Sequence, residues 1–381
     1  MKKAIYIFLL SALPILSQAQ HILTAENNMM RPEDEIVKQQ VDYKDPGRAG
    51  QNVLWNFGEL NLQNEAYRLT YSEDRNGQIR GTEHNTRYYY RLSGDTLLQT
   101  GYENPTTLSI DEQPEILMVF PVYYGDSTFG YFNANGRYSE RLHISAMGTL
   151  CGYADAYGMM ILPNGDTMKN VLRIRSVKTF AETMKSLKRG NKQPKTFVST
   201  DSINSRLQND SVLFEIETFR WYAKGYRYPI FETVNTITKT QDSIQKFFNV
   251  AFFYPPQEHY YLEDDPENLA ELDSLNSSND SSSNSNDSSN NSGNADWGIF
   301  TYNIHPNPVY NVLSLEYYAE KPSDVIITLY DAQRHLLYNK SINNSSGVYN
   351  VTINMGGYVT GSYFLKIYNG HETFDEVIIK Y

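Results

Sequence analysis

The sequence predicts an all-β protein: a large N-terminal antiparallel β-sandwich, a disordered Ser/Asn-rich linker and a small C-terminal sandwich of immunoglobulin or fibronectin type. Apolar and polar residues alternate with a period of two along most of the chain, which is the pattern of half-buried strands. Turn-forming pairs such as Asn-Gly and Asn-Pro separate these runs. The 31 tyrosines and 17 phenylalanines also favour strands, where aromatic side chains pack well.

Residues 1–19 have the features of a secretory signal peptide. Lys2 and Lys3 form its basic end, and a short apolar run covers residues 4–16. We expect cleavage between Ala19 and Gln20, because Ser-Gln-Ala provides the small residues that signal peptidase requires. No cysteine stands directly after the cleavage point, so a lipid anchor is not expected. No transmembrane segment is predicted in the mature chain, because no later apolar run is long enough.

Residues 20–262, called the cargo domain below, are predicted to form the large sandwich with ten or more strands. A division into two sandwiches near Gly136 is the alternative. The expected strands are 67–71, 86–92, 96–102, 115–120, 142–150, 154–162, 171–180, 214–222, 230–238 and 244–254.

Trp55 lies in the segment 50–60, where a Trp-Asn-Phe trio stands between polar flanks. Such a trio is typical of an edge strand that places its aromatic side chains in the core. An exposed indole ring could instead stack on a sugar, but core packing is the preferred interpretation.

Residues 263–297 differ sharply in composition from the rest of the chain. Every residue from 276 to 295 is Ser, Asn, Asp, Gly or Ala, so this segment cannot bury enough apolar surface to offset its chain entropy. It is therefore predicted to be a disordered linker. It also carries nine acidic and no basic residues, whereas the domains on either side sum to about −2 each. Without a basic face, nucleic-acid binding is not expected.

Residues 298–381, called the C-terminal module, read as a separate small sandwich. Short alternating runs are separated by turn-forming residues, and turns recur every 8 to 12 residues. The expected strands are 312–317, 325–330, 335–338, 349–353, 363–367 and 374–379.

Several short motifs in this module occur together in a fixed order. They are Pro306-Asn307-Pro308 before the first strand, a middle strand ending in Asp331, Gly361-Ser362-Tyr363 and the terminal Lys380. In these residues the module resembles the type A C-terminal sorting domain of the type IX secretion system. The family has Gly close after the Asp, where this chain has Arg334, and a Gly would suit a turn with positive φ. A fibronectin-like stalk without a sorting role is the alternative.

The resemblance implies where the protein goes and what handles it. Type IX machinery at the outer membrane of a Gram-negative bacterium would recognise the module. The cargo would then be secreted or held at the cell surface, commonly after removal of the module and attachment to surface lipopolysaccharide. Segments 50–60, 155–165 and 170–173 also resemble uncharacterised cargo domains of the same secretion class.

Asp followed by Ser or Thr and then an apolar residue or Thr occurs seven times, where composition predicts about one. This motif is similar to the O-glycosylation acceptor of bacteria with the same secretion system. Turn formation at strand ends is the alternative explanation. The candidate acceptors are Thr96, Ser127, Thr167, Ser202, Ser211, Ser243 and Ser274.

Motifs of known catalytic, cofactor and metal sites are absent, so none of these residue classes is predicted. The single cysteine, Cys151, is interpreted as a small buried apolar residue. His143 and Asp155 could meet in the fold, but a structural histidine is preferred to a general base. The acidic run 263–267 lacks the spacing of a calcium loop and is expected to be solvated. The basic stretch 180–195 is interpreted as a solvated insertion, with a short helix over 181–187.

Three functions are compatible with this pattern. The preferred hypothesis is an exported protein whose β-sandwich binds a glycan or a protein without catalysis. A secreted peptidase or glycosidase is the first alternative, and a structural part of the cell envelope is the second.

Overall fold

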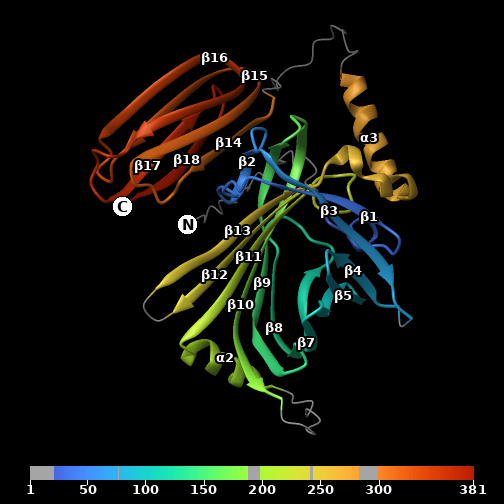
Figure 1. Ribbon diagram of the computed structural model, residues 1–381. Helices are drawn as coiled ribbons and strands as arrows, with labels where there is room; N and C mark the ends of the chain where they lie inside the picture. The colour runs from blue at the N-terminus through green and yellow to red at the C-terminus, as the bar shows by residue number, and fades with distance from the viewer. Residues whose placement is uncertain (1–20, 76, 188–197, 241–242, 283–297) are drawn as a thin grey trace, which may run out of the picture.

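The computed structural model describes residues 21–75, 77–187, 198–240, 243–282 and 298–381, and these fold into a large and a small all-β unit (Figure 1). The alternating runs of the cargo domain become thirteen strands in this described part. They are β1 (Glu35–Val41), β2 (Gly50–Asn56), β3 (Leu62–Glu73), β4 (Ile79–Glu83), β5 (Thr86–Ser93), β6 (Thr96–Glu103), β7 (Thr107–Val119), β8 (Ser127–Tyr138), β9 (Leu142–Ile161), β10 (Thr167–Ser186), β11 (Val212–Tyr222), β12 (Phe231–Thr240) and β13 (Ile244–Phe253).

Twelve of these strands, β1 and β3 to β13, close into one antiparallel barrel. From β3 to β13 each strand pairs with the next along the chain. β1 closes the ring, because it pairs with β3 on one side and with Gln39–Val41 opposite 251–253 of β13 on the other. Only three residue pairs join β1 to β13, so this is the shortest seam of the barrel.

The cargo domain is therefore a single closed barrel and not the predicted two-sheet sandwich. Alternation with a period of two is the same in both architectures, because each strand has one inner and one outer face in either. The alternative division near Gly136 is also wrong. Gly136 lies inside β8, and a Cβ there would approach the carbonyl oxygen of Leu108 on β7 to 2.1 Å. That position requires glycine because two strands approach closely.

β2 lies outside the ring and pairs in parallel with residues 156–161 of β9. Trp55 on β2 is 1% exposed, and its ring packs edge-on to Trp221 with centroids 6.0 Å apart. Phe57 stacks on Phe231 at 4.2 Å. These rings belong to an apolar core between β2 and the outer wall of the barrel. The interpretation of Trp55 as a core residue is confirmed.

Helices cover the end of the barrel next to β2, whereas α2 (Thr200–Asn209) lies at the opposite end (Figure 1). The covering elements are α1 (Ala25–Asn28), η1 (Pro256–Glu258), η2 (Tyr260–Asp264) and α3 (Pro266–Ser282). α3 falls in the stretch that was expected to be disordered. Residues 283–297, the remainder of the predicted linker, lie outside the described residues.

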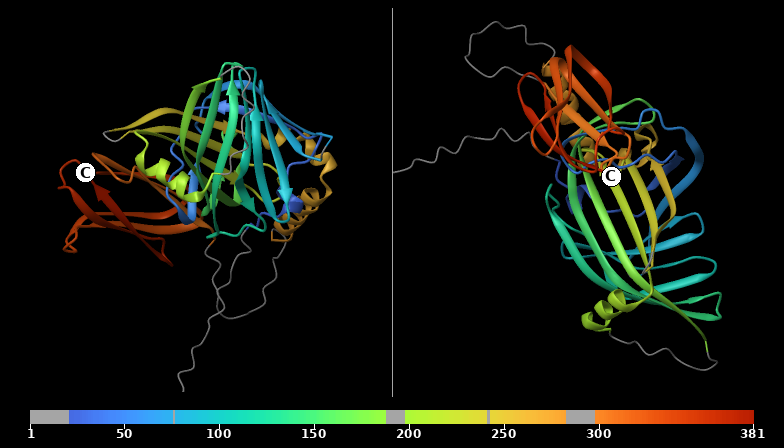
Figure 2. Two further views of the ribbon diagram at one scale, coloured as in Figure 1. Left: turned by 90° about the horizontal axis from the view of Figure 1, so that it is seen from below. Right: turned by 90° about the vertical axis from the view of Figure 1, so that its left-hand side faces the viewer.

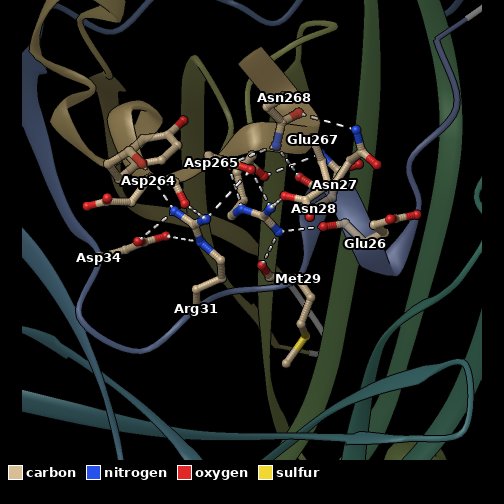
Figure 3. Close-up of polar contacts among 12 residues, drawn as sticks. Glu26, Asn27, Asn28, Met29, Arg31, Asp34, Asp264, Asp265, Glu267 and Asn268 are labelled. Atoms are coloured by element: carbon tan, nitrogen blue, oxygen red, sulfur yellow. Dashed lines mark hydrogen bonds and ion pairs between the residues drawn. The ribbon is translucent and has the colours of Figure 1, made fainter. Parts of the chain in front are cut away.

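Figure 3 shows why the chain is ordered there. Asp265, directly before α3, is fully buried and receives two hydrogen bonds from Arg227, at 2.8 and 2.6 Å. Asn268 on α3 donates to Asp265 at 2.9 Å and to the carbonyl of Asn27 at 3.0 Å. The start of α3 is thus fixed to the N-terminal segment and the barrel, and Asp265 is not the solvated charge that was predicted.

The C-terminal module has its own core. Its strands are β14 (Phe300–His305), β15 (Val312–Tyr330), β16 (Leu336–Asn354), β17 (Gly361–Tyr368) and β18 (Thr373–Lys380). Each of the two 19-residue strands, β15 and β16, covers two of the predicted strands, apart from His335, which lies just before β16. The buried cluster that these five strands share consists entirely of module residues, from Phe300 to Ile378. The module lies beside the β2 end of the barrel in both Figure 1 and Figure 2.

Among the described residues, no helix has the length and apolar character needed to cross a membrane.

Candidate functional site

The barrel encloses a cavity of about 660 Å³ that is lined by side chains from eleven of its twelve strands. The inward positions of the strands alternate with outward ones, so residues far apart in sequence meet inside. Three lining residues, His84, Phe248 and Asn249, are exposed. They lie at the β4–β5 turn and on the part of β13 that β1 does not pair with, and they mark where the cavity reaches solvent.

Paired charges form one wall of this cavity. The Nζ atom of Lys38 lies 3.1 Å from Glu232 Oε1 and 2.9 Å from Glu83 Oε1, and it sits 4.0 Å from the centre of the Phe252 ring. Arg220 Nε donates to Glu232 Oε2 at 2.6 Å. Despite burial, these two cations lower the pKa of Glu232 to about 2. The wall therefore carries fixed charges that neutralise one another.

Tyrosines cover much of the remaining surface. Tyr71, Tyr222 and Tyr254 are at most 7% exposed, and burial raises the pKa of each, to about 12 for Tyr222. They are therefore neutral phenols at physiological pH. Within the described part of the chain, the hydroxyls of these three residues and of Tyr90 have no hydrogen-bond partner. Buried hydroxyl groups usually have one, so these groups are available to a bound molecule.

A second ion pair also lines the cavity: the Nζ atom of Lys178 lies 2.5 Å from Glu115 Oε1. Asp111 is 8% exposed, and its Oδ2 atom has no hydrogen-bond partner. Burial, and then the charge of Glu115, raise the pKa of Asp111 to about 7, although Lys178 opposes this. Asp111 does not line the cavity, so its protonation has consequences for stability rather than for a bound molecule.

The fold brings most of the predicted sorting residues to one end of the C-terminal module. Gly361 at the start of β17 pairs with Lys380 at the end of β18. Tyr363 lies two residues further along β17 and pairs with Ile378. Asn307, between Pro306 and Pro308, donates to the carbonyl of Val377 at 2.8 Å and accepts from Ile379 N at 2.9 Å. Asp331 follows Tyr330, which pairs with Phe364. Whether the export machinery reads these residues stays a prediction.

Arg334 has a positive φ, the backbone conformation that would suit the glycine of the resembled family at this position. Its φ is +69°, in the left-handed region, and its N–H donates to the carbonyl of Asp331 at 3.0 Å. The Asp331 carboxylate fixes the same turn, because its Oδ1 accepts from Gln333 N and His335 N at 2.9 and 2.8 Å. The turn therefore keeps its geometry, with a non-glycine residue in a strained position.

Replacing Arg334 by glycine should stabilise the C-terminal module by about 0.5–1 kcal/mol, because glycine adopts positive φ without steric cost. Urea unfolding of the module, followed in the full chain, would measure this. Arg334→Ala is the matched control: it removes the same side chain but keeps the Cβ and its strain. Equal stability of the two variants would contradict the explanation.

Six of the seven candidate glycosylation acceptors are exposed, and Thr96 is half-buried. Ser243 lies before β13 and Thr167 begins β10, both at hairpin ends, whereas Ser202 and Ser274 lie in α2 and α3. Ala19 and Gln20, the predicted cleavage site, lie outside the described residues.

Other sequence interpretations can be placed as well. His143 and Asp155 do not meet, because they lie twelve residues apart on β9 and Asp155 binds Arg173. Cys151 is half-buried on the outer wall and is a free thiol, so it is less buried than expected. Residues 181–186 continue strand β10 and do not form a helix, and 188–197 lie outside the described residues. No group of three or more His, Cys, Asp or Glu side chains in the described part of the chain could hold a metal ion.

The sequence interpretation missed the cavity residues. Lys38, Arg220 and Glu232 occupy alternate positions of strands, and alternate polar positions look solvent-facing when the other face is apolar. The one available signal was the run Thr218, Arg220, Tyr222, in which polar and aromatic residues share a face.

Comparison with known proteins identifies the module. Residues 303–380 match the family described as the secretion system C-terminal sorting domain. The C-terminal module is thus a type IX secretion sorting domain that engages the type IX machinery, and the protein is exported to the cell surface or secreted by a Gram-negative bacterium. No curated protein matches the chain.

Among solved structures, the crystal structure of dimeric latent PorU from Porphyromonas gingivalis is similar over 92% of this chain and 34% of that one. The identity is 9% and the TM-score is 0.20. The chain spans about a third of the length of that protein. At this TM-score the likeness carries no argument about fold or function.

Proposed function

We propose that the exported protein is a non-catalytic binding protein whose barrel holds a small neutral carbohydrate in its interior. The observation that carries this proposal is the cavity of about 660 Å³ with its unpaired tyrosine hydroxyls. This volume lies within the range of small-molecule sites, which combine apolar surface with a few convergent polar groups. The ring faces of the tyrosines provide the apolar surface, and their hydroxyls provide the polar groups.

The charges of the cavity favour a neutral ligand. Lys38, Arg220 and Lys178 each face a carboxylate within 3.1 Å. A charged ligand would have to displace one of these partners and leave it buried without compensation, which costs several kcal/mol. A hydroxyl-rich ring compound can instead bind the tyrosine hydroxyls and leave the ion pairs intact. A glycan ligand was one of the two classes expected from the sequence.

The two alternatives lack comparable support. A hydrolase would need a carboxyl that can hold a proton inside the cavity, and the two described carboxyls whose pKa burial raises, Asp111 and Glu182, do not line it. A structural envelope component would not need an interior cavity. We also propose, from the family resemblance, that the module is removed after export and that the cargo is attached to surface lipopolysaccharide. O-glycosylation at the exposed Asp-Ser and Asp-Thr motifs is part of the same proposal.

Calorimetric titration of the mature protein tests the ligand. The probes are glucose, galactose, N-acetylglucosamine and lactose, with glucuronate and octanoate as anionic comparators. We expect at least one neutral sugar to bind more tightly than either anion. Tyr71→Phe and Tyr254→Phe should each weaken that binding about tenfold, because each removes one buried hydrogen bond.

Tyr138→Phe is the matched control, because Tyr138, at the end of β8, is 40% exposed and does not line the cavity. It should leave affinity unchanged. Tighter binding of octanoate or glucuronate would overturn the proposal, and so would full affinity in both cavity variants.

A further inference from the structure

The C-terminal module and the cargo domain meet through residues of opposite charge. The cargo contributes Lys44, Arg48 and Lys169, and the module contributes acidic residues. The ion pairs are Lys44 to Glu316 at 3.6 Å, Arg48 to Glu376 at 3.5 Å and Lys169 to Glu320 at 2.7 Å. A single parallel bridge between Val53 of β2 and Tyr302 of β14 lies among them.

Arg48 is the centre of this contact. Its guanidinium lies 3.9 Å from the centre of the Tyr302 ring, and its Nε donates to the Tyr302 carbonyl at 3.2 Å. The Tyr302 hydroxyl in turn donates to Glu376 Oε1 at 2.8 Å, the carboxylate that Arg48 also faces. The side chain of Arg48 is only 13% exposed, so its pairing is stronger than that of a surface pair.

Buried side chains of the cargo domain fix the backbone next to Arg48. Arg173 is 1% exposed and donates to the Pro46 and Gly47 carbonyls at 2.5 and 3.2 Å. Two hydrogen bonds at 2.8 and 2.9 Å tie Arg173 to Asp155. The Trp55 indole N–H also donates to the Pro46 carbonyl, at 3.0 Å. The turn that presents Arg48 is therefore anchored in the barrel by contacts that do not involve the module.

The contact leaves the opposite end of the module accessible. The ion pairs involve Glu316 and Glu320 in the first half of β15 and Glu376 on β18, whereas Gly361 and Lys380 lie at the end that carries the C-terminus. Figure 1 shows that end on the side away from the barrel. In this arrangement Gly361 and the segment 306–308 stay exposed, whereas Tyr363 and Lys380 are buried within the module.

We propose that the basic face formed by Lys44, Arg48 and Lys169 is a binding surface for an acidic sorting module, occupied in this chain by its own. The module is then docked on the cargo in one orientation until it is removed, and does not swing freely on a linker. Removal uncovers the basic face, which can accept the module of a second copy. Because every pair joins a cargo cation to a module carboxylate, the docking is weakened by salt.

A cut-chain experiment tests this inference in the full-length protein. A protease site is introduced between α3 and β14, the chain is cut, and the fragments are run on size exclusion at about 0.05 M and about 0.5 M NaCl. The module has its own core and stays folded after cutting. We expect the fragments to co-elute at low salt and to separate at high salt.

Charge reversal identifies the residues. Arg48→Glu should weaken association about 100-fold, and Arg48→Glu combined with Glu376→Arg should restore most of it. Lys169→Glu, on the surface and without risk to folding, should weaken association about fivefold. Arg137→Glu is the control, because Arg137, at the end of β8, forms its ion pair with Glu140 of the cargo domain. Separation of the parent fragments at low salt would overturn the inference, as would unchanged association in Arg48→Glu.

Discussion

Replacing Arg227 by methionine is expected to destabilise the cargo domain by about 3–5 kcal/mol, because it removes the nearest cation from the buried Asp265 carboxylate and leaves only Asn268 and the more distant Arg31 beside it. Asp265 is fully buried, and Arg227 supplies its two charge-assisted hydrogen bonds. The same guanidinium donates to the carbonyls of Glu26 and Met29 at 2.7 and 3.0 Å (Figure 3). Urea unfolding of the cargo domain should show the loss, together with release of α3.

Arg206→Met provides the matched control. Arg206 makes the same kind of contact with Asp210, but the two side chains are 28% and 27% exposed, so this change should cost less than about 1 kcal/mol. Replacing Arg227 by methionine and Asp265 by leucine together should cost less than the sum of the single changes, because no buried charge is left alone. If Arg227→Met lowered the free energy of unfolding no more than Arg206→Met does, the attachment of α3 to the barrel would not depend on the Arg227–Asp265 ion pair.

Replacing Asp111 by asparagine is expected to stabilise the protein by about 2–4 kcal/mol at pH 8 and by little at pH 4. Burial raises the pKa of the Asp111 carboxyl from 3.8 to about 7. In the unfolded chain the carboxyl ionises near its ordinary pKa, whereas in the folded chain it keeps its proton until about pH 7. Ionisation therefore stabilises the unfolded state relative to the folded state as the pH rises from about 4 to about 7, and the folded protein loses stability in that range.

The measurement is the free energy of unfolding of parent and variant across this pH range. Asparagine removes the ionisation, so the difference between the two proteins should grow with pH and level off above about pH 7. Glu112→Gln, at the exposed neighbouring position, controls for the change in net charge and should show no such growth. A constant difference from pH 4 to pH 8 would mean that Asp111 is ionised in the folded protein throughout.

The C-terminal sorting module was the part of this protein that the sequence predicted best. Its motifs are short, local and in a fixed order, and their recognition did not depend on how distant strands pair. The strained turn shows the same: the glycine that the resembled family has at this point indicated a turn with positive φ, and Arg334 has a φ of +69°. Trp55 was also placed correctly in a core, because a large aromatic side chain between polar flanks has few other uses.

The start of α3 shows where composition was insufficient. Residues 263–282 are acidic and polar, which predicts disorder when the segment is considered alone. Asp265 and Asn268 nevertheless find buried partners in Arg227 and Asn27, which are 38 and 241 positions away in sequence. An isolated segment gains nothing from such partners, so its own composition cannot reveal them.

The sequence by itself determined that the chain is all-β and carries a sorting module, since alternation, turns and terminal motifs are local properties. Tertiary structure alone decided that the cargo is a closed barrel, because closure depends on β1 pairing with both β3 and β13, and 251–253 lie more than 200 residues beyond β1. Closure also decided the binding site: once the ring is closed, the alternate positions of Lys38, Arg220 and Glu232 face a cavity instead of solvent. The physical reason is that the alternation of residues gives each strand two faces. Only the strands that pair along its two edges decide whether a face lies against a core, a cavity or solvent.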